Sequence, residues 1–150
     1  MNAIKEAAYR HILSLLDEKI ATAQHAVLSA KESRNNETKS SAGDKHETGR
    51  AMSQIELDNS EQQLGKVLNL KRQFLQLDVQ TKKTGIEPGC LVRTDKTLYF
   101  ISIGLGRIQV ENHVCYAVSL QSPIGQVLQG KKTGDMVMFQ GEETVIMEVL

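Results

Sequence analysis

Two acidic residues, Asp44 and Glu47, lie three positions apart in the stretch SSAGDKHETGR at 40–50, between two long helix-like segments. Residues at i and i+3 of a helix share one face, so both carboxylates could reach the same divalent cation. Two protein oxygens do not complete the shell of Mg²⁺, which prefers six oxygen ligands and keeps waters or phosphates. The pair therefore predicts a weak metal site that another macromolecule completes.

The same spacing also has a purely structural interpretation. Asp is a favoured N-cap, and Glu at the third helical position completes a capping box that satisfies free N–H groups at the helix start. Gly43 and the two serines before it would then form the turn. Residue chemistry alone leaves both interpretations open.

Two other motifs approach known sites without completing them. The run GQVLQGKKT at 125–133 places Lys132 where a phosphate-binding loop needs Ser or Thr to reach Mg²⁺. The run HETGR at 46–50 starts like the zinc-protease motif but ends in Arg50 where the second histidine is required. We therefore expect neither a nucleotide site nor a zinc site.

The first half of the chain has the periodicity of helices. An apolar stripe recurs every three or four residues before the turn and resumes less regularly after it, at Ile12, Leu16, Ile20, Ala23, Val27, Ala30, Met52, Ile55, Leu64, Val67, Leu68, Phe74 and Leu75. Gly and Pro are absent from 1–42. We expect helices over about 2–36 and about 45–78, packed antiparallel, each arm roughly 45 Å long.

The second half has the texture of a β domain. The segment TKKTGIEPG at 81–89 reads as a linker, and β-rich runs follow at 90–93, 97–103, 107–110, 114–120, 136–139 and 143–149. Ser122 and Pro123 predict a short helix over 124–128, because Ser is a good N-cap and Pro a good first helical residue. We therefore predict an α+β fold, with a helical hairpin (coiled coil) in 1–80 and a small antiparallel β domain with one short helix in 81–150.

Composition narrows the class of protein. Eighteen basic and eighteen acidic residues give zero formal net charge, which argues against a general nucleic-acid coat. No apolar run approaches the roughly 20 residues that cross a bilayer, and the start has no signal core, so we expect a cytoplasmic protein without a membrane partner. Cys90 and Cys115 are expected to be reduced. The hairpin buries its own stripe, so we expect a monomer.

Two stretches match motifs of one protein family. The stretch GDKHE at 43–47 looks like the Gly-Asp-x-x-Glu at the tip of that family's N-terminal coiled coil. The run SPIGQVLQGK at 122–131 is similar to the Ser-Pro-Ile-Ala…Leu-x-Gly-Lys run of its C-terminal domain, and GDMV at 134–137 continues it. Through these motifs, and through the order of its parts, nearly the whole chain resembles the GreA/GreB family of bacterial transcript-cleavage factors.

The resemblance implies a transcription elongation factor that binds RNA polymerase. Its C-terminal domain, of a fold like that of FK506-binding proteins, would dock at the mouth of the secondary channel while the hairpin enters the channel. Asp44 and Glu47 would help to hold the second Mg²⁺ of the polymerase, whose own active site hydrolyses the nascent RNA of a backtracked complex. The chain would thus be no enzyme and would bind no metal by itself.

Further contacts follow from charge and position. Lys45 and Arg50 would meet RNA phosphate or polymerase carboxylates near the tip. We expect docking on the polymerase around exposed loops that include Ser122, Pro123, Ile124, Lys131 and Lys132.

Two departures from the family pattern affect the tip. The segment 32–41 is longer than the corresponding family stretch by roughly two helical turns, which would lengthen the helix or loosen the tip. Thr48, Gly49 and Arg50 replace an acidic and Asn-rich continuation. A channel-binding regulator of the same build, without cleavage activity, is therefore the alternative function.

Two other classes are weaker alternatives. A prolyl isomerase or chaperone would need an apolar aromatic pocket, for which Tyr99, Phe100, Tyr116 and Phe139 are too few. A plain coiled-coil adaptor would fit the hairpin but would leave the C-terminal match unexplained.

Overall fold

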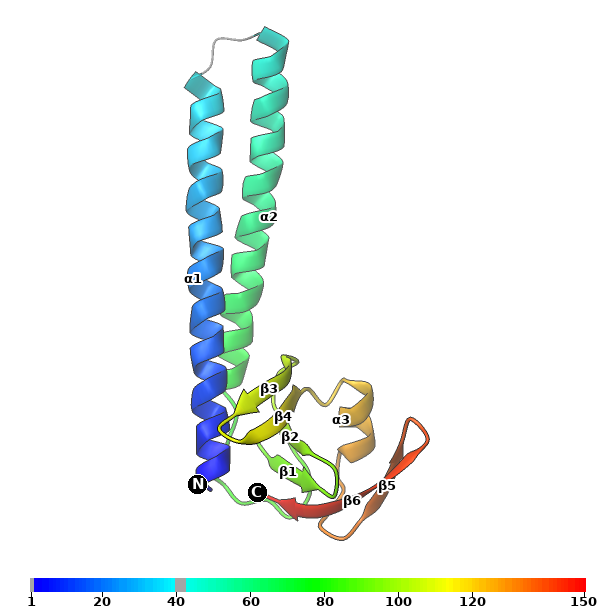
Figure 1. Cartoon of the computed structure of the whole chain (residues 1–150). Coiled ribbons are helices and arrows are strands. Elements are labelled where there is room, and N and C mark those ends of the chain that lie inside the picture. Colours follow the sequence, from blue (N-terminus) through cyan, green and yellow to red (C-terminus); the bar gives the residue numbers. More distant parts are fainter. Residues whose placement is uncertain (1, 40–42) are drawn as a thin grey trace. The chain divides into compact units, whose positions relative to one another are not determined.

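The computed structural model describes the backbone of residues 2–39 and 43–150, and the side chains of 2–36 and 48–150. Figure 1 shows two long helices followed by a six-stranded sheet with one short helix. The predicted α+β class, a helical hairpin followed by a β domain with one short helix, is confirmed. None of the helices in these ranges is long and apolar enough to cross a membrane.

By internal contacts the chain forms two compact units, Met1–Ile12 with Gln73–Leu150, and Leu13–Arg72. These units do not divide at the predicted boundary between residues 80 and 81. The reason is that the first turns of one helix and the last residues of the other pack against the sheet. We call the two parts the sheet unit and the hairpin unit.

The hairpin consists of α1 (Ala3–Lys39) and α2 (Gly43–Leu75), which lie side by side and antiparallel (Figure 1). The predicted stripe of α1 is confirmed, since its members are buried except Ile20, which is half-buried. In the hairpin unit Val27 and Ala30 form a core cluster with Leu57, and Leu64 packs against it. Burial of this stripe stabilises the helices more than their intrinsic propensity does.

The predicted stripe of α2 is wrong at several positions. Exposed side chains are Met52, Ile55, Leu68 and Leu75. The packed face of α2 instead carries the buried or half-buried Ser53, Leu57, Ser60, Leu64, Val67, Lys71 and Phe74. Their alternating steps of four and three are the seven-residue repeat of paired helices. Three of these positions are polar, so a search for apolar residues alone finds the wrong face.

One polar member of this seam is held by a charge on the other helix. The Lys71 ammonium contacts the Asp17 carboxylate at 2.6 Å, with the two side chains 33% and 60% exposed. A pair this exposed contributes about 0 to 1 kcal/mol. The Lys71–Asp17 pair therefore adds little stability, and its main effect is to favour one register of α1 against α2.

The sheet contains β1 (Leu91–Thr94), β2 (Leu98–Ile101), β3 (Gly106–Val110), β4 (His113–Val118), β5 (Met136–Phe139) and β6 (Glu142–Val149), in the order β3-β4-β2-β1-β6-β5. Each predicted β-rich run overlaps one of these strands. The prediction of a purely antiparallel sheet is wrong, because β2 and β4 pair in parallel, from Leu98 beside Cys115 to Ile101 beside Val118. Strand β3 lies at the edge of the sheet and pairs with β4 in antiparallel fashion, and β4 therefore runs in the same direction as its other neighbour, β2.

The two faces of the sheet pack against different helices of the sheet unit. On one face Val92, Ile101 and Ile146 form a core with Leu128 of the short helix α3 (Pro123–Leu128). On the other face the Phe100 ring lies 6.2 Å from that of Phe74 at the end of α2, and the Phe74 ring stacks on Tyr9 of α1 at 4.8 Å. The sheet is thus covered on both sides.

Both cysteines are buried and free, as expected. Burial raises the pKa of the Cys115 thiol from its ordinary value of 9.0 to about 11. Below about pH 9 the thiol is protonated in the folded and the unfolded chain. Between about pH 9 and about pH 11 the unfolded chain loses this proton first, so the free energy of unfolding should fall with rising pH, by roughly 2 to 3 kcal/mol in all.

Urea unfolding of wild type and Cys115→Ala over this pH range tests the prediction. The substitution should remove this fall, although the cavity that it leaves lowers stability at every pH. Other titrating groups, including Lys5, are the same in both proteins, so the difference between the two curves isolates Cys115. Parallel curves would contradict the prediction.

Candidate functional site

The tip acids lie in the first turn and a half of α2. The helix begins at Gly43, so the backbones of Asp44 and Glu47 are helical and one turn apart. The predicted N-cap role of Asp44 does not fit this start, because an N-cap residue precedes the helix instead of lying within it. The side chains of Asp44, Lys45 and Glu47 lie outside the described residues, and their metal and contact roles stay predictions.

The backbone before the tip answers one question left open by the sequence. Helix α1 continues to Lys39, so the part of the long segment up to that residue extends the helix. Toward the tip, the Arg34 guanidinium donates a hydrogen bond to the Gln54 side-chain oxygen of the other helix at 3.4 Å. Arg50 is exposed, as a contact to RNA phosphate requires. Among the residues with described side chains, no three His, Cys, Asp or Glu gather as metal ligands.

At the second predicted site, the Ser-Pro motif at 122–123 forms the start of α3. Ser122 is the N-cap of α3, and its hydroxyl accepts a hydrogen bond from the Gly125 N–H at 3.0 Å and donates one to the Ser119 carbonyl at 2.6 Å. Pro123 is the first helical residue, as predicted. Ile124 is only 9% exposed and belongs to the core of the sheet unit. Thus Ser122 and Ile124 have structural roles.

The remaining predicted docking residues are available on the surface. Pro123, Lys131 and Lys132 are exposed. The chain passes from α3 to the lysines through Gly130, whose N–H donates to the Ile86 carbonyl at 3.0 Å and whose φ is +76°. This hydrogen bond ties the lysine-bearing loop to the segment before β1. The docking role of Pro123, Lys131 and Lys132 stays a prediction.

Gly125 is required by the close approach of α3 to the preceding loop. A Cβ at this position would lie 2.0 Å from the Ser119 carbonyl oxygen and 2.8 Å from the Leu120 Cα. The family motif that the run resembles has Ala here, so this chain places the start of α3 closer to its preceding loop than an alanine permits.

Ser122→Ala should destabilise the sheet unit by about 1 kcal/mol, because it removes the N-cap of α3. Urea unfolding of the full chain, monitored by Tyr fluorescence, measures the change. Ser14→Ala, at an exposed position inside α1, is the matched control and should be neutral or slightly stabilising. Equal effects of the two substitutions would contradict the capping role.

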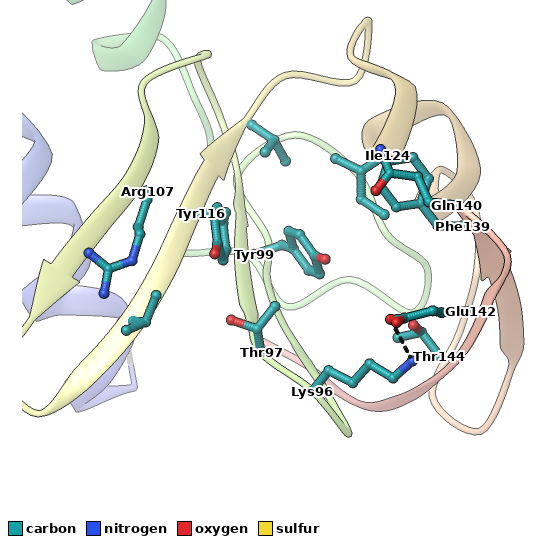
Figure 2. Close-up of a pocket in the computed structure, with 12 residues that line it drawn as sticks. Lys96, Thr97, Tyr99, Arg107, Tyr116, Ile124, Phe139, Gln140, Glu142 and Thr144 are labelled. Carbon is teal, nitrogen blue, oxygen red and sulfur yellow. Dashed lines mark hydrogen bonds and ion pairs between the residues drawn. The ribbon is translucent and has the colours of Figure 1, made fainter.

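A cavity that the sequence analysis missed lies on the α3 face of the sheet. It has a volume of about 750 Å³ and is drawn in Figure 2. The rings of Tyr99 and Tyr116 lie 5.9 Å apart on its floor, and Phe139 forms part of the opposite wall. Burial raises the pKa of Tyr99, and the neighbouring Tyr116 adds to the shift, so this phenol stays protonated at neutral pH.

Three of the four aromatic residues judged too few for a pocket therefore share one cavity, while Phe100 packs on the other face. No local signal could have found this site. It depends on the parallel pairing that places Tyr99 beside Tyr116, and on the β5–β6 hairpin that carries Phe139.

Comparison of the chain with protein-family models and with curated proteins gives no match. The solved structure of the transcription factor Gfh1 aligns over 95% of this chain and 93% of its own, at 16% sequence identity and a TM-score of 0.35. A likeness at this level carries no argument about function.

Proposed function

We propose that this chain is a transcription elongation factor that binds RNA polymerase and stimulates cleavage of backtracked RNA. The observation that carries the proposal is the helical start of α2, which places Asp44 and Glu47 one turn apart where the two long helices meet. The motifs that resemble the GreA/GreB family, at this turn and around α3, supply the partner and the reaction. The chain itself would be no enzyme.

The dimensions of the hairpin support this role. The hairpin unit contains about 27 residues of α1, which span roughly 40 Å at 1.5 Å per residue. Two helices side by side are roughly 20 Å wide. Such a rod can carry two carboxylates into a deep catalytic cavity of a much larger enzyme.

The carboxylate oxygens of Asp44 and Glu47 are suitable ligands for the second Mg²⁺ of the polymerase. Carboxylate oxygens are its preferred protein ligands, and the two tip acids leave positions for polymerase carboxylates, RNA phosphate and water. When bound there, the metal pair activates water and stabilises the displaced oxygens. Asp44 and Glu47 would hold and orient this second Mg²⁺. Lys45 and Arg50 would offset the charge of the RNA phosphate beside them.

We further propose that the exposed loop after α3 contributes to docking. Lys131→Glu combined with Lys132→Glu should weaken binding to core polymerase roughly tenfold at low salt, because it reverses charge on this surface. Competition binding with labelled protein measures the affinity. Lys82→Glu, an exposed lysine before β1, is the control and should change affinity less than twofold. Equal affinities of wild type and the double variant would remove this loop from the interface.

One observation favours a second candidate function. Because α1 remains helical to Lys39, the arm is longer than the family pattern, and an acid displaced by about 1 Å from its productive position loses much of its effect. A regulator that occupies the channel without stimulating cleavage is therefore the alternative. Transcript cleavage on backtracked complexes, with polymerase binding measured in the same samples, distinguishes the two functions.

A further inference from the structure

The cavity on the α3 face is a binding site that the proposed function does not use. Tyr99 of β2 and Tyr116 of β4 are register partners, so their rings form a continuous floor. In Figure 2 Ile124 and Phe139 face this floor across the cavity. The volume of about 750 Å³ lies within the range of about 300 to 1,000 Å³ that is typical of ligand pockets.

Several polar side chains around the cavity have no hydrogen-bond partner among the residues with described side chains, 2–36 and 48–150. Thr144 is only 8% exposed, and its hydroxyl is unpaired within the described part of the chain. The hydroxyls of Tyr99 and Tyr116 are likewise unpaired there. For Thr144, which is buried, a hydroxyl that has left water without a new partner is unfavourable and requires an explanation, whereas Tyr99 and Tyr116 are half-buried. A ligand with amide groups would supply these partners.

The charges around the cavity exclude some ligands. The Lys96 ammonium contacts the Glu142 carboxylate at 3.2 Å, so these two charges offset each other. Arg107 lines the edge beyond Tyr116, and Figure 2 shows its guanidinium directed away from Phe139. With the cations placed in this way, the cavity does not favour a phosphate-bearing ligand. It favours an uncharged one.

We propose that this cavity binds a short, extended, uncharged peptide segment of a partner protein. One apolar side chain of the segment would lie between the tyrosine floor and the wall of Ile124 and Phe139. The hydroxyls of Tyr99 and Thr144 would exchange hydrogen bonds with the peptide backbone, which provides both donors and acceptors. This inference does not rest on the proposed function, and a failure of transcript cleavage would leave it unchanged.

Titration of the ¹⁵N-labelled full chain with N-acetyl-Ala-Leu-Pro-Phe-amide tests the proposal by NMR. We expect saturable shifts of backbone amides around Tyr99, Tyr116 and Phe139. N-acetyl-Gly-Gly-Gly-Gly-amide lacks the apolar side chain and should bind at least tenfold more weakly. Adenosine monophosphate tests the nucleotide alternative and should bind more weakly than the first peptide.

Hydroxyl deletions make the test specific. Tyr99→Phe and Thr144→Val should each weaken peptide binding two- to tenfold, the factor that corresponds to one hydrogen bond. Tyr9→Phe removes the same hydroxyl at a ring that stacks on Phe74 outside the cavity, and should leave affinity unchanged. These substitutions keep the rings and side-chain shapes, so the folded chain is retained.

Three results would overturn the proposal. They are the absence of saturable shifts with the apolar peptide, equal affinities of wild type and both hydroxyl variants, and tighter binding of adenosine monophosphate than of the peptide.

Discussion

Gly89→Ala is expected to destabilise the sheet unit by about 3 kcal/mol or more. Gly89 has a φ of +97°, and a Cβ there would lie 2.2 Å from the Asp78 carbonyl oxygen. Its N–H also donates to the Ile101 carbonyl at 2.7 Å, which fixes the turn before β1 against β2. An alanine would therefore combine an unfavourable backbone conformation with a collision against backbone, and neither can relax without loss of this hydrogen bond.

Urea unfolding of the full chain at neutral pH measures this effect. Gly104→Ala is the matched control, because it lies in the same unit, has no atom within 4 Å of an added Cβ and does not have a positive φ. We expect the control to change the free energy of unfolding by less than about 0.5 kcal/mol. A loss below about 1 kcal/mol for Gly89→Ala would show that the turn relaxes easily.

Asp44→Asn combined with Glu47→Gln is expected to lower stimulated transcript cleavage by about a hundredfold or more, because it removes both metal-binding charges from the tip. Asn and Gln keep the size of Asp and Glu and retain a carbonyl oxygen, so the two substitutions remove the charges and leave the side-chain shapes. Binding to polymerase and helix content by circular dichroism should be unchanged. Cleavage rates over a range of Mg²⁺ concentrations give the measurement.

Glu56→Gln combined with Glu61→Gln is the control, since it removes two exposed charges from α2 away from the tip. We expect its cleavage rate to stay within about twofold of wild type. If both double variants lost cleavage equally, the overall charge of the hairpin would be responsible and the tip acids would have no special role.

Local signals predicted the elements of this fold well. The helical stripe of α1 is buried as expected, and Ser122 with Pro123 identified α3 from its first residues. The positions of the strands also followed from short apolar runs bounded by turn residues. These features depend on neighbours in the chain, so the sequence carries them directly.

Features that depend on pairing between distant residues were not predicted. The parallel contact of β2 and β4 follows from the position of β3 at the edge, which no periodicity records. In α2 the polar Ser53 and Lys71 take positions on the packed face, while the apolar Met52 and Ile55 are exposed. For the candidate site, the acidic pair was visible in the sequence, whereas the aromatic cavity required the assembled sheet.

The most direct test of the central claim is a transcript-cleavage assay on stalled, backtracked complexes of the cognate polymerase, with Mg²⁺ and the purified full chain. We expect the chain to shorten the RNA from its 3′ end much faster than polymerase alone. Polymerase binding is measured in the same samples. No acceleration, with binding confirmed, would contradict the claim and would indicate a channel-binding regulator without cleavage activity.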